Sequence, residues 1–407
     1  MTDSVFTLRW GILSTGNMAK QFVEDLCQDP KARDVHDIKH VVRAVCSSSS
    51  IDKARAFIQE NLGTDAKTVP YGSIEELVRD PEVDVVYIAT PTKVHYANTK
   101  VCLEAKKPVL CEVGVAMVMN LRLRLIRRLN WVGTNRKRVS KFKLTRDYSS
   151  HSIVVTINSA QLSSLVALSK SQNTFLAEAL WTRYFPIVTY IHDLLHTQKV
   201  LGKIHRVTSD LSLNFSINLP DHSIRDANSG GGALLAVGVY PLTWVMLALF
   251  ENPENSRTMP EIMAQMIMEG GKLHASDEQT NATMVFRKIR ATAVVSCSLV
   301  MSTPPGQSVL IEGEKGQLTI PWSPHRPESY TLKLFKTKTS AATTETKDFP
   351  IPGKGLFYQA DSVARALRDG KKEVDECTLD DSLAMMKVLD KIRAQGGLVY
   401  PGNLEDV

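Results

Sequence analysis

The sequence predicts an α/β protein in which a doubly wound parallel-sheet domain is followed by an α+β domain with an open, mostly antiparallel sheet. In the first half, short and almost continuously apolar strands alternate with helical patterns, which is typical of a parallel sheet covered on both faces. In the second half, strands rich in β-branched residues follow one another. Because 407 residues exceed one ordinary domain, we predict two, at 1–180 and 181–407.

The elements of the first domain can be followed along the chain. Apolar runs predict strands at 6–13, 38–45, 83–89 and 109–111. Between them, helical periodicity runs through Met18, Phe22 and Leu26, then from Ala54 to a stop at Gly63, and then over 94–105. The same alternation resumes at 162–168 and 175–180.

The second domain has a different order of elements. Strands are expected at 291–300, 308–311, 317–320 and 330–335, with turns at 304–306 and 313–316. Helices are expected at 232–249, 356–368 and 379–394. We expect the final helix to pack back onto the first domain.

Residues 113–154 interrupt the first domain with a strongly basic segment. It holds ten Lys or Arg and one acid, Asp147, while the rest of the chain has 39 basic and 42 acidic residues. The overall charge of +6 is therefore a property of this segment and does not indicate a nucleic-acid partner. The flanks would join as one strand-to-helix turn that lacks only a Lys-Pro pair after Glu112.

Three origins of this segment stay open. It could be a translated intron or gene-model error, a genuine insertion, or a basic arm around 121–129 that binds membrane or nucleic acid. The alternating pattern of 121–129 suits neither a clean helical face nor the host fold, so we favour the first origin.

Composition limits the compartment and the partners. No stretch of about 18 uncharged apolar residues is present, and the N-terminus lacks the pattern of a leader peptide. The six cysteines are scattered, without Cys-x-x-Cys or metal spacing. We therefore expect a cytoplasmic protein with no bound metal, no membrane partner and no nucleic-acid partner.

The turn after the first strand is a candidate phosphate loop. Small residues there would let the backbone approach a pyrophosphate, and the N–H groups of the following helix would bind it. The position, at the end of the first strand of a βαβ unit, is that of a Rossmann dinucleotide fingerprint, although Ser14 stands where the first glycine is usual. The predicted cofactor-binding residues here are Ser14, Thr15, Gly16, Asn17 and Met18.

The end of the second strand indicates which dinucleotide is bound. An NAD site normally presents an acid there to the ribose 2′-hydroxyl. This chain has Ser47 and Ser48 in a serine run, with Lys53 and Arg55 beyond, and these groups suit the 2′-phosphate of NADP. Alternatively, the serines cap the next helix, and both roles can hold.

Four motifs occur in register along the chain. They are Ala89-Thr90-Pro91 with His95, Cys111-Glu112, the run from Glu178 to Pro186, and Gly231-Gly232-Ala233-Leu234-Leu235 with Gly238-Val239-Tyr240-Pro241. Together they resemble the glucose-fructose oxidoreductase/inositol dehydrogenase (Gfo/Idh/MocA) family, in particular its branch of dimeric dihydrodiol dehydrogenases and NADP-dependent D-xylose 1-dehydrogenases. The resemblance covers everything except residues 113–154.

The resemblance implies roles for the matching residues. Tyr240 would be the catalytic acid/base, exchanging a proton with the substrate hydroxyl. The substrate pocket would be lined by Trp181, Arg183 and Phe185, although aromatic residues there could also be core. Thr90 and Pro91 would shape the loop beside the nicotinamide, His95 would approach the ribose or substrate, and Glu112 would begin a Glu-Lys-Pro motif.

The resemblance also implies an activity. It would be NADP-dependent oxidation of a sugar or cyclic diol, from D-xylose to D-xylono-1,5-lactone or from a trans-1,2-dihydrodiol to a catechol. A homodimer through the exposed face of the second sheet is expected as well, because an open sheet with an uncovered apolar face normally needs a partner.

Two departures from the family pattern bear on that activity. Glu112 is followed by Val113 instead of a lysine, and Ala236 stands where relatives usually carry an acid four residues before the tyrosine. The lysine would hold the substrate hydroxyl and lower the pKa of the tyrosine. Its absence leaves open a catalytically impaired, NADP-binding regulator as the alternative function.

Overall fold

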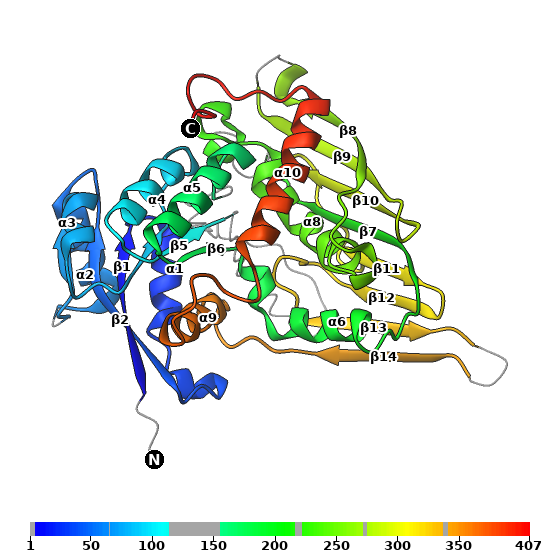
Figure 1. Ribbon diagram of the computed structural model, residues 1–407, viewed down its shortest axis with the longest axis horizontal. Helices are drawn as coiled ribbons and strands as arrows, with labels where there is room; N and C mark the ends of the chain where they lie inside the picture. The colour runs from blue at the N-terminus through cyan, green and yellow to red at the C-terminus, as the bar shows by residue number, and fades with distance from the viewer. Residues whose placement is uncertain (1–4, 65, 114–154, 216–221, 272–274, 337–340) are drawn as a thin grey trace, which may run out of the picture.

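The computed structural model describes residues 5–64, 66–113, 155–215, 222–271, 275–336 and 341–407. Within these residues the chain forms two sheets that lie side by side, with the N-terminal sheet on the left of Figure 1 and the larger sheet on the right. The basic segment falls almost wholly outside the described residues, and the three origins considered for it therefore lie outside them as well.

The first sheet has six parallel strands in the order β3-β2-β1-β4-β5-β6. Its strands are β1 (Phe6–Leu13), β2 (Ile38–Cys46), β3 (Val69–Tyr71), β4 (Val85–Ile88), β5 (Val109–Glu112) and β6 (Leu176–Ala179). Its helices are α1 (Asn17–Leu26), α2 (Ile51–Leu62), α3 (Ile74–Arg79), α4 (His95–Glu104) and α5 (Ser159–Gln172). The order reverses between β1 and β4, as in a Rossmann fold, so the predicted fold class is confirmed for this half.

The second sheet has eight strands in the order β14-β13-β12-β11-β7-β10-β9-β8. Among the described strand pairs of this sheet, only β7 and β10 are parallel, so the sheet is mostly antiparallel, as predicted. Its strands are β7 (Ile204–Ser212), β8 (Glu261–Met268), β9 (Asp277–Phe286), β10 (Ala291–Ser298), β11 (Val309–Gly313), β12 (Gly316–Ile320), β13 (Ser329–Leu334) and β14 (Thr343–Asp348).

One face of the second sheet is covered by a buried helical segment. It consists of a π-helical turn η6 (Leu234–Gly238), the helix α8 (Val239–Val245) and a second π-helical turn η7 (Met246–Phe250). Helix α8 packs against β7 and β10, while the opposite face carries exposed apolar side chains such as Met263 and Val294. Helix α6 (Pro186–His196) connects the short turn η3 (Trp181–Tyr184) to β7.

The last two helices return to the first sheet. Helix α9 (Phe357–Arg368) packs against α1, β1 and β2, and α10 (Leu379–Gly396) lies between α5 and β8 (Figure 1). Polar contacts reinforce this return, since Arg393 Nη1 donates to the Ile157 carbonyl at 3.1 Å and the Ser159 N–H donates to Asp390 at 2.8 Å. Both helices therefore fix the second half of the chain onto the first sheet.

We propose a domain boundary between residues 180 and 181, because β6 is the last strand of the first sheet and β7 the first strand of the second.

None of the helices in the described part of the chain combines the length and the hydropathy needed to cross a membrane.

Candidate active site

The predicted phosphate loop lies at the carboxyl end of β1, where the strand order reverses. Ser14 has φ of 143°, a backbone conformation that favours glycine, and its Oγ accepts a hydrogen bond from the Gly16 N–H at 3.0 Å. Gly16 precedes the first turn of α1, and no side chain among the described residues caps this helix. The loop therefore leaves the N–H groups of the first turn open toward an anion.

The serine run after β2 divides between two roles. Ser50 is the N-cap of α2 and accepts from the Asp52 N–H at 3.1 Å. Ser47 is buried, with its hydroxyl 3.2 Å from that of Ser49, and Ser48 is exposed. The exposed Arg55 forms a 2.7 Å ion pair with Asp52. Helix capping thus uses Ser50 and leaves Ser47 and Ser48 available, so the two predicted roles are compatible.

The loop after β4 is held from behind by His95. The imidazole is fully buried, and its Nε2 lies 2.6 Å from the Thr90 carbonyl oxygen. Asn98 Nδ2 donates to Thr90 Oγ1 at 3.0 Å, while Pro91 is exposed. The contact with the Thr90 carbonyl makes His95 a support for the Thr90-Pro91 turn. The predicted approach of His95 to the ribose or the substrate stays a prediction.

Glu112 is a buried carboxyl group at the end of β5. Its Oε1 accepts a hydrogen bond from the Tyr87 hydroxyl, and its Oε2 accepts from the Val113 N–H at 3.1 Å. Burial raises the pKa of Glu112 to about 8, and the hydrogen bond from Tyr87 only partly opposes this rise. The next residue, Val113, is also buried and supplies no cation.

Tyr240 lies at the start of α8, directly after the π-helical turn η6. Its ring is fully buried, and its hydroxyl has no hydrogen-bond partner among the described residues. Burial raises the pKa of Tyr240 well above its usual value, the negative charge of Glu112 raises it further, and Trp181 acts to lower it. An unpaired buried hydroxyl is costly unless a ligand satisfies it, which indicates a binding position.

Aromatic rings form a wall around Tyr240. The His325 ring is centred 5.4 Å from that of Tyr240 and 6.0 Å from that of Trp181, which in turn lies 5.4 Å from Phe185. The buried indole Nε1 of Trp181 also has no partner within the described part of the chain. The structure thus brings Trp181 close to Tyr240, with Phe185 behind it. His325 was missed at the sequence level, because a lone His in an irregular segment carries no pattern.

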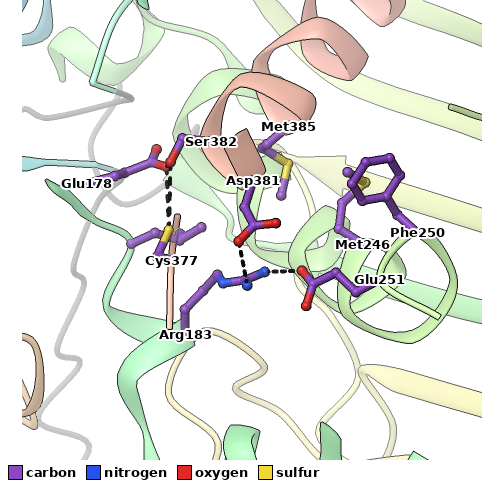
Figure 2. Close-up of a pocket in the computed structure, with 10 residues that line it drawn as sticks. Glu178, Arg183, Met246, Phe250, Glu251, Cys377, Asp381, Ser382 and Met385 are labelled. Atoms are coloured by element: carbon purple, nitrogen blue, oxygen red, sulfur yellow. Dashed lines mark hydrogen bonds and ion pairs between the residues drawn. The ribbon is translucent and has the colours of Figure 1, made fainter. Parts of the chain in front are cut away.

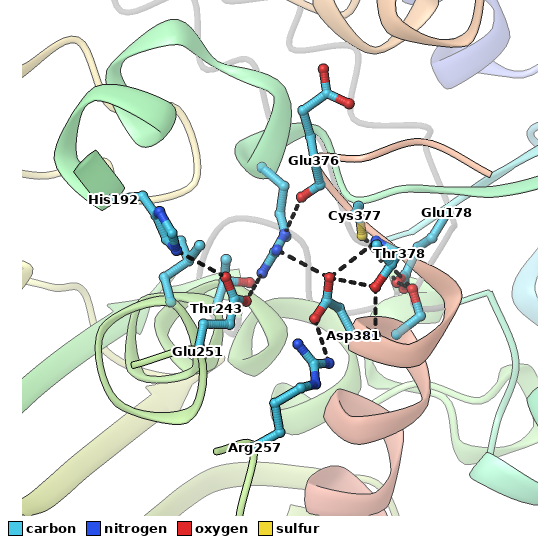
Figure 3. Close-up of polar contacts among 12 residues, drawn as sticks. Glu178, His192, Thr243, Glu251, Arg257, Glu376, Cys377, Thr378 and Asp381 are labelled. Carbon is cyan, nitrogen blue, oxygen red and sulfur yellow. Dashed lines mark hydrogen bonds and ion pairs between the residues drawn. The ribbon is translucent and has the colours of Figure 1, made fainter. Parts of the chain in front are cut away.

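Arg183, predicted to line the substrate pocket, has described contacts with two acids and a backbone carbonyl. Its guanidinium donates to Glu251 at 2.6 Å and lies 3.5 Å from Asp381 (Figure 2). It also donates to the Glu376 carbonyl at 2.7 Å (Figure 3). Figure 3 shows the same network continuing from Asp381 to Arg257. A buried cation requires paired anions, and Glu251 and Asp381 supply them. Arg183 therefore holds η3 against the first turn of α10.

The glycine-rich motif before Tyr240 is explained by close backbone approach. A Cβ on Gly231 would lie 2.5 Å from the Ile224 carbonyl oxygen, and one on Gly232 would lie 2.1 Å from Asp277 Oδ1. The Asp277 carboxylate accepts from the Leu234 N–H at 2.9 Å and so caps the helical segment. Ala236, the second departure from the family pattern, lies fully buried within η6.

A parallel-sheet domain with an open phosphate loop, joined to a mixed-sheet domain that contributes a buried tyrosine, defines a two-domain oxidoreductase of the dinucleotide-binding class. The chain belongs to the Gfo/Idh/MocA oxidoreductase family. Residues 8–122 match the model described as "Oxidoreductase family, NAD-binding Rossmann fold", and residues 191–319 match the GFO/IDH/MocA C-terminal domain.

Characterised relatives extend over nearly the whole chain. A D-xylose 1-dehydrogenase (NADP(+)) from Hypocrea jecorina is 34% identical, with 97% of this chain and 94% of that protein covered. A trans-1,2-dihydrobenzene-1,2-diol dehydrogenase from Xenopus laevis is 28% identical, with coverages of 97% and 99%. The family predicted from the four motifs is confirmed, and these relatives give no support to the alternative of a non-catalytic regulator.

Solved structures share the fold. An NAD-binding oxidoreductase from Klebsiella pneumoniae superimposes with a TM-score of 0.72 at 15% identity, covering 96% of each chain. A 3-ketoreductase from Actinomadura kijaniata, solved with NADP and TDP-benzene, gives 0.68 at 19% identity and covers 97% of this chain and all of that one.

Proposed function

We propose that the protein is an NADP-dependent oxidoreductase that acts on a CH–OH group of a sugar or a cyclic diol. The observation that carries the proposal is the buried Tyr240 hydroxyl, which has no hydrogen bond of standard geometry among the described residues and lies close enough to Trp181 for this side chain to lower its pKa. A ligand hydroxyl or carbonyl oxygen placed between them would satisfy both groups. The names of the H. jecorina and X. laevis relatives support this substrate class.

The first sheet offers a fitting place for NADP. The open first turn of α1 would bind the pyrophosphate, and Ser47 and Ser48 would face the 2′-phosphate with no acid at the end of β2. Thr90 and Pro91, held by His95, would border the nicotinamide. When bound, NADP supplies the hydride acceptor or donor.

The aromatic wall favours a ring-shaped substrate. Faces of Trp181 and His325 suit the apolar faces of a pyranose or a cyclohexadiene diol, while Tyr240 exchanges a proton with the reacting oxygen. Without the family lysine the pKa of Tyr240 stays high. We therefore expect turnover to be slower, by on the order of 10²–10⁴-fold, than in a variant that carries the lysine.

The assembly is proposed to be a homodimer formed through the open face of the second sheet. Cross-strand pairing aligns Met263, Thr283, Val294 and Thr208 on this face, and Met263 is 76% exposed. A flat exposed row of apolar and β-branched side chains is unusual on a monomer. We further propose a cytoplasmic location, because all six cysteines are free.

The experiment combines binding with turnover. Tryptophan fluorescence should show tighter binding of NADP(H) than of NAD(H), and equal affinities would contradict the cofactor assignment. NADPH formation with D-xylose or a trans-dihydrodiol should be measurable in the full chain and abolished in Tyr240→Phe. Tyr184→Phe, which also removes a buried hydroxyl but one bonded to the Glu178 carbonyl, is the matched control and should keep activity.

A further inference from the structure

A glycine-rich turn begins the helical segment formed by η6 and α8. The Gly232 N–H of this turn donates to the Ile224 carbonyl at 2.7 Å. The carbonyl of the same peptide group, which belongs to Gly231, accepts from the Tyr400 hydroxyl at 2.9 Å. The Gly232 carbonyl then accepts from the Ala236 N–H at 3.1 Å, within η6. One peptide group, held on both sides, therefore sets where the helical segment starts.

The same turn also contacts the first domain. A Cβ on Gly230 would lie 2.6 Å from Ile157 Cδ1 and 4.0 Å from Thr92 Cγ2. Thr92 belongs to the loop after β4, and Ile157 lies just before α5. The turn that leads to Tyr240 is thus packed against the loop that we propose to border the nicotinamide.

Tyr400 comes from the tail, residues 397–407, which follows α10. In Figure 1 this tail is the red loop that leaves the end of α10 and runs toward α5. The Tyr400 side chain is buried, and the Arg393 guanidinium lies over its ring at 5.1 Å from the centroid. Burial raises the pKa of Tyr400 well above its usual value, so the hydroxyl stays protonated and keeps donating to the turn.

One carboxylate closes the tail into a compact loop. Glu405 Oε1 accepts from the Tyr400 N–H at 3.0 Å, and its Oε2 accepts from Arg393 Nη2 at 2.9 Å. Arg393 Nη1 in turn donates to the Ile157 carbonyl at 3.1 Å. The backbone of Tyr400 is thus fixed by the tail itself, and its ring by α10.

The tail is anchored to the first domain through its backbone carbonyls. Gln161 Nε2 donates to the carbonyls of Leu404 and Asp406, at 2.8 and 2.7 Å. Asn158 Nδ2 donates to the carbonyl of Glu405 at 2.9 Å. Because Gln161 is buried, its bonds to the tail are shielded from water and hold it firmly. The tail therefore moves with the first domain, and Tyr400 connects it to the turn of the second.

We propose that Tyr400 is a positioning residue for Tyr240. This role rests on the proposed function. Tyr400 ties the Gly231 carbonyl to a tail that is anchored on the first domain, and so holds the Tyr240 hydroxyl at a fixed place relative to the sheet that would bind NADP. Hydride and proton transfer occur at the same carbon–oxygen group of the substrate, so the two partners of that group must stay in register.

The test measures kcat and KM for alcohol oxidation by the full chain. Tyr400→Phe removes the hydroxyl and keeps the ring beneath Arg393. We expect kcat to fall by on the order of 10-fold to 10²-fold, because a small displacement of the acid/base slows the reaction. KM for the substrate and the Kd for NADP should stay at their wild-type values, because the groups proposed to bind both are unchanged.

Tyr184→Phe is the matched control, because the Tyr184 hydroxyl also donates to a buried backbone carbonyl, that of Glu178. Its kcat should equal that of the wild type. If Tyr400→Phe keeps the wild-type kcat, or loses no more than Tyr184→Phe, the positioning role is overturned while the proposed function stands. A wild type that turns over no sugar or diol would instead overturn the proposed function, and this role with it.

Glu405→Ala tests the same connection from the tail. It leaves the Tyr400 hydroxyl in place but removes the carboxylate that holds the Tyr400 N–H and Arg393, so kcat should fall as well. The double variant of Tyr400→Phe with Glu405→Ala should have the same kcat as Tyr400→Phe alone, because both changes break one connection. Losses that multiply would show two independent effects and would overturn the shared route.

Hydrogen exchange gives a readout without turnover. The N–H groups of Leu234 and Ala236 are bonded at the start of η6, to Asp277 and to Gly232. Tyr400→Phe should make these two amides exchange faster than in the wild type, whereas Tyr184→Phe should leave their exchange unchanged. Equal exchange in all three proteins would contradict the fixing of the turn by Tyr400.

Discussion

Ser14 shows how a single backbone conformation limits the phosphate loop. Its φ of 143° lies where side chains are strained, and the Ser14 hydroxyl offsets part of this by bonding to Gly16. We expect Ser14→Val to lower the free energy of unfolding by about 1–3 kcal/mol, because a β-branched side chain is more strained than serine at this positive φ. Ser14→Gly should stay within about 1 kcal/mol of the wild type. Urea unfolding measures the free energies of both variants. A Ser14→Val variant as stable as Ser14→Gly would contradict a strained backbone at Ser14.

Arg183 shows why one residue of a recognised motif has another role. Arg183→Met removes the buried cation shared by the half-buried carboxylates of Glu251 and Asp381 and should cost about 3–5 kcal/mol, measured by urea unfolding. Arg287→Met removes an exposed pair with Glu261 and should leave Tm unchanged. Equal effects of the two changes would contradict the structural role of Arg183.

Sequence reasoning could propose Tyr240 and Trp181 as site residues because their neighbours along the chain form a motif. It could not place Arg183, His325 or Tyr400. Arg183 pairs with Asp381, the Thr182 hydroxyl holds the His325 carbonyl, and Tyr400 reaches the Gly231 carbonyl from the tail. Each of these partners is more than 100 residues away, and only the fold brings them together.

At the scale of elements, α9 is anchored to the first sheet by one buried carboxylate. Burial alone would raise the pKa of Asp361, but a two-point contact from Arg33 and a 2.8 Å contact with His40 outweigh it and lower that pKa. An acid with a depressed pKa contributes stability above its unfolded value of about 3.9, and this contribution is lost as pH falls through the folded pKa.

We therefore expect Asp361→Asn to be less stable than the wild type at pH 7 by about 3–5 kcal/mol. The difference should shrink steadily as pH falls below about 4. Urea unfolding at several pH values measures it, and a difference that is constant from pH 7 to 3 would contradict the anchoring role of Asp361.

The elements themselves were predictable where burial imposes a pattern. β4 is apolar and buried along its whole length because both faces of the first sheet are covered there, so it is visible in the sequence. β14 was not predicted, because this edge strand reads Thr-Thr-Glu-Thr-Lys-Asp and is mostly exposed. A polar edge strand is held by backbone hydrogen bonds to its neighbouring strand, so its sequence shows little of the hydropathy pattern that predicts strands.

At the scale of the whole molecule, the open face of the second sheet predicts assembly. Light scattering at micromolar concentration should give about twice the chain mass of 45.2 kDa. Met263→Asp combined with Val294→Asp should give a monomer, because two charges would be buried at the centre of the interface. Val399→Asp, at an exposed site outside the sheets, is the control. A monomeric wild type would contradict the dimer.

The basic segment bears on the central claim, which is Tyr240-dependent, NADP-linked turnover. It begins beside Glu112 at the carboxyl end of β5, and open α/β folds bind their ligands at this edge. The most direct measurement compares NADPH formation by the chain as it stands with that of a variant in which Lys-Pro replaces residues 113–154. The variant should be faster by on the order of 10²–10⁴-fold with D-xylose or a trans-dihydrodiol, and Tyr240→Phe should remove the gain. A variant that binds NADP yet turns over no sugar, polyol or diol would contradict the account.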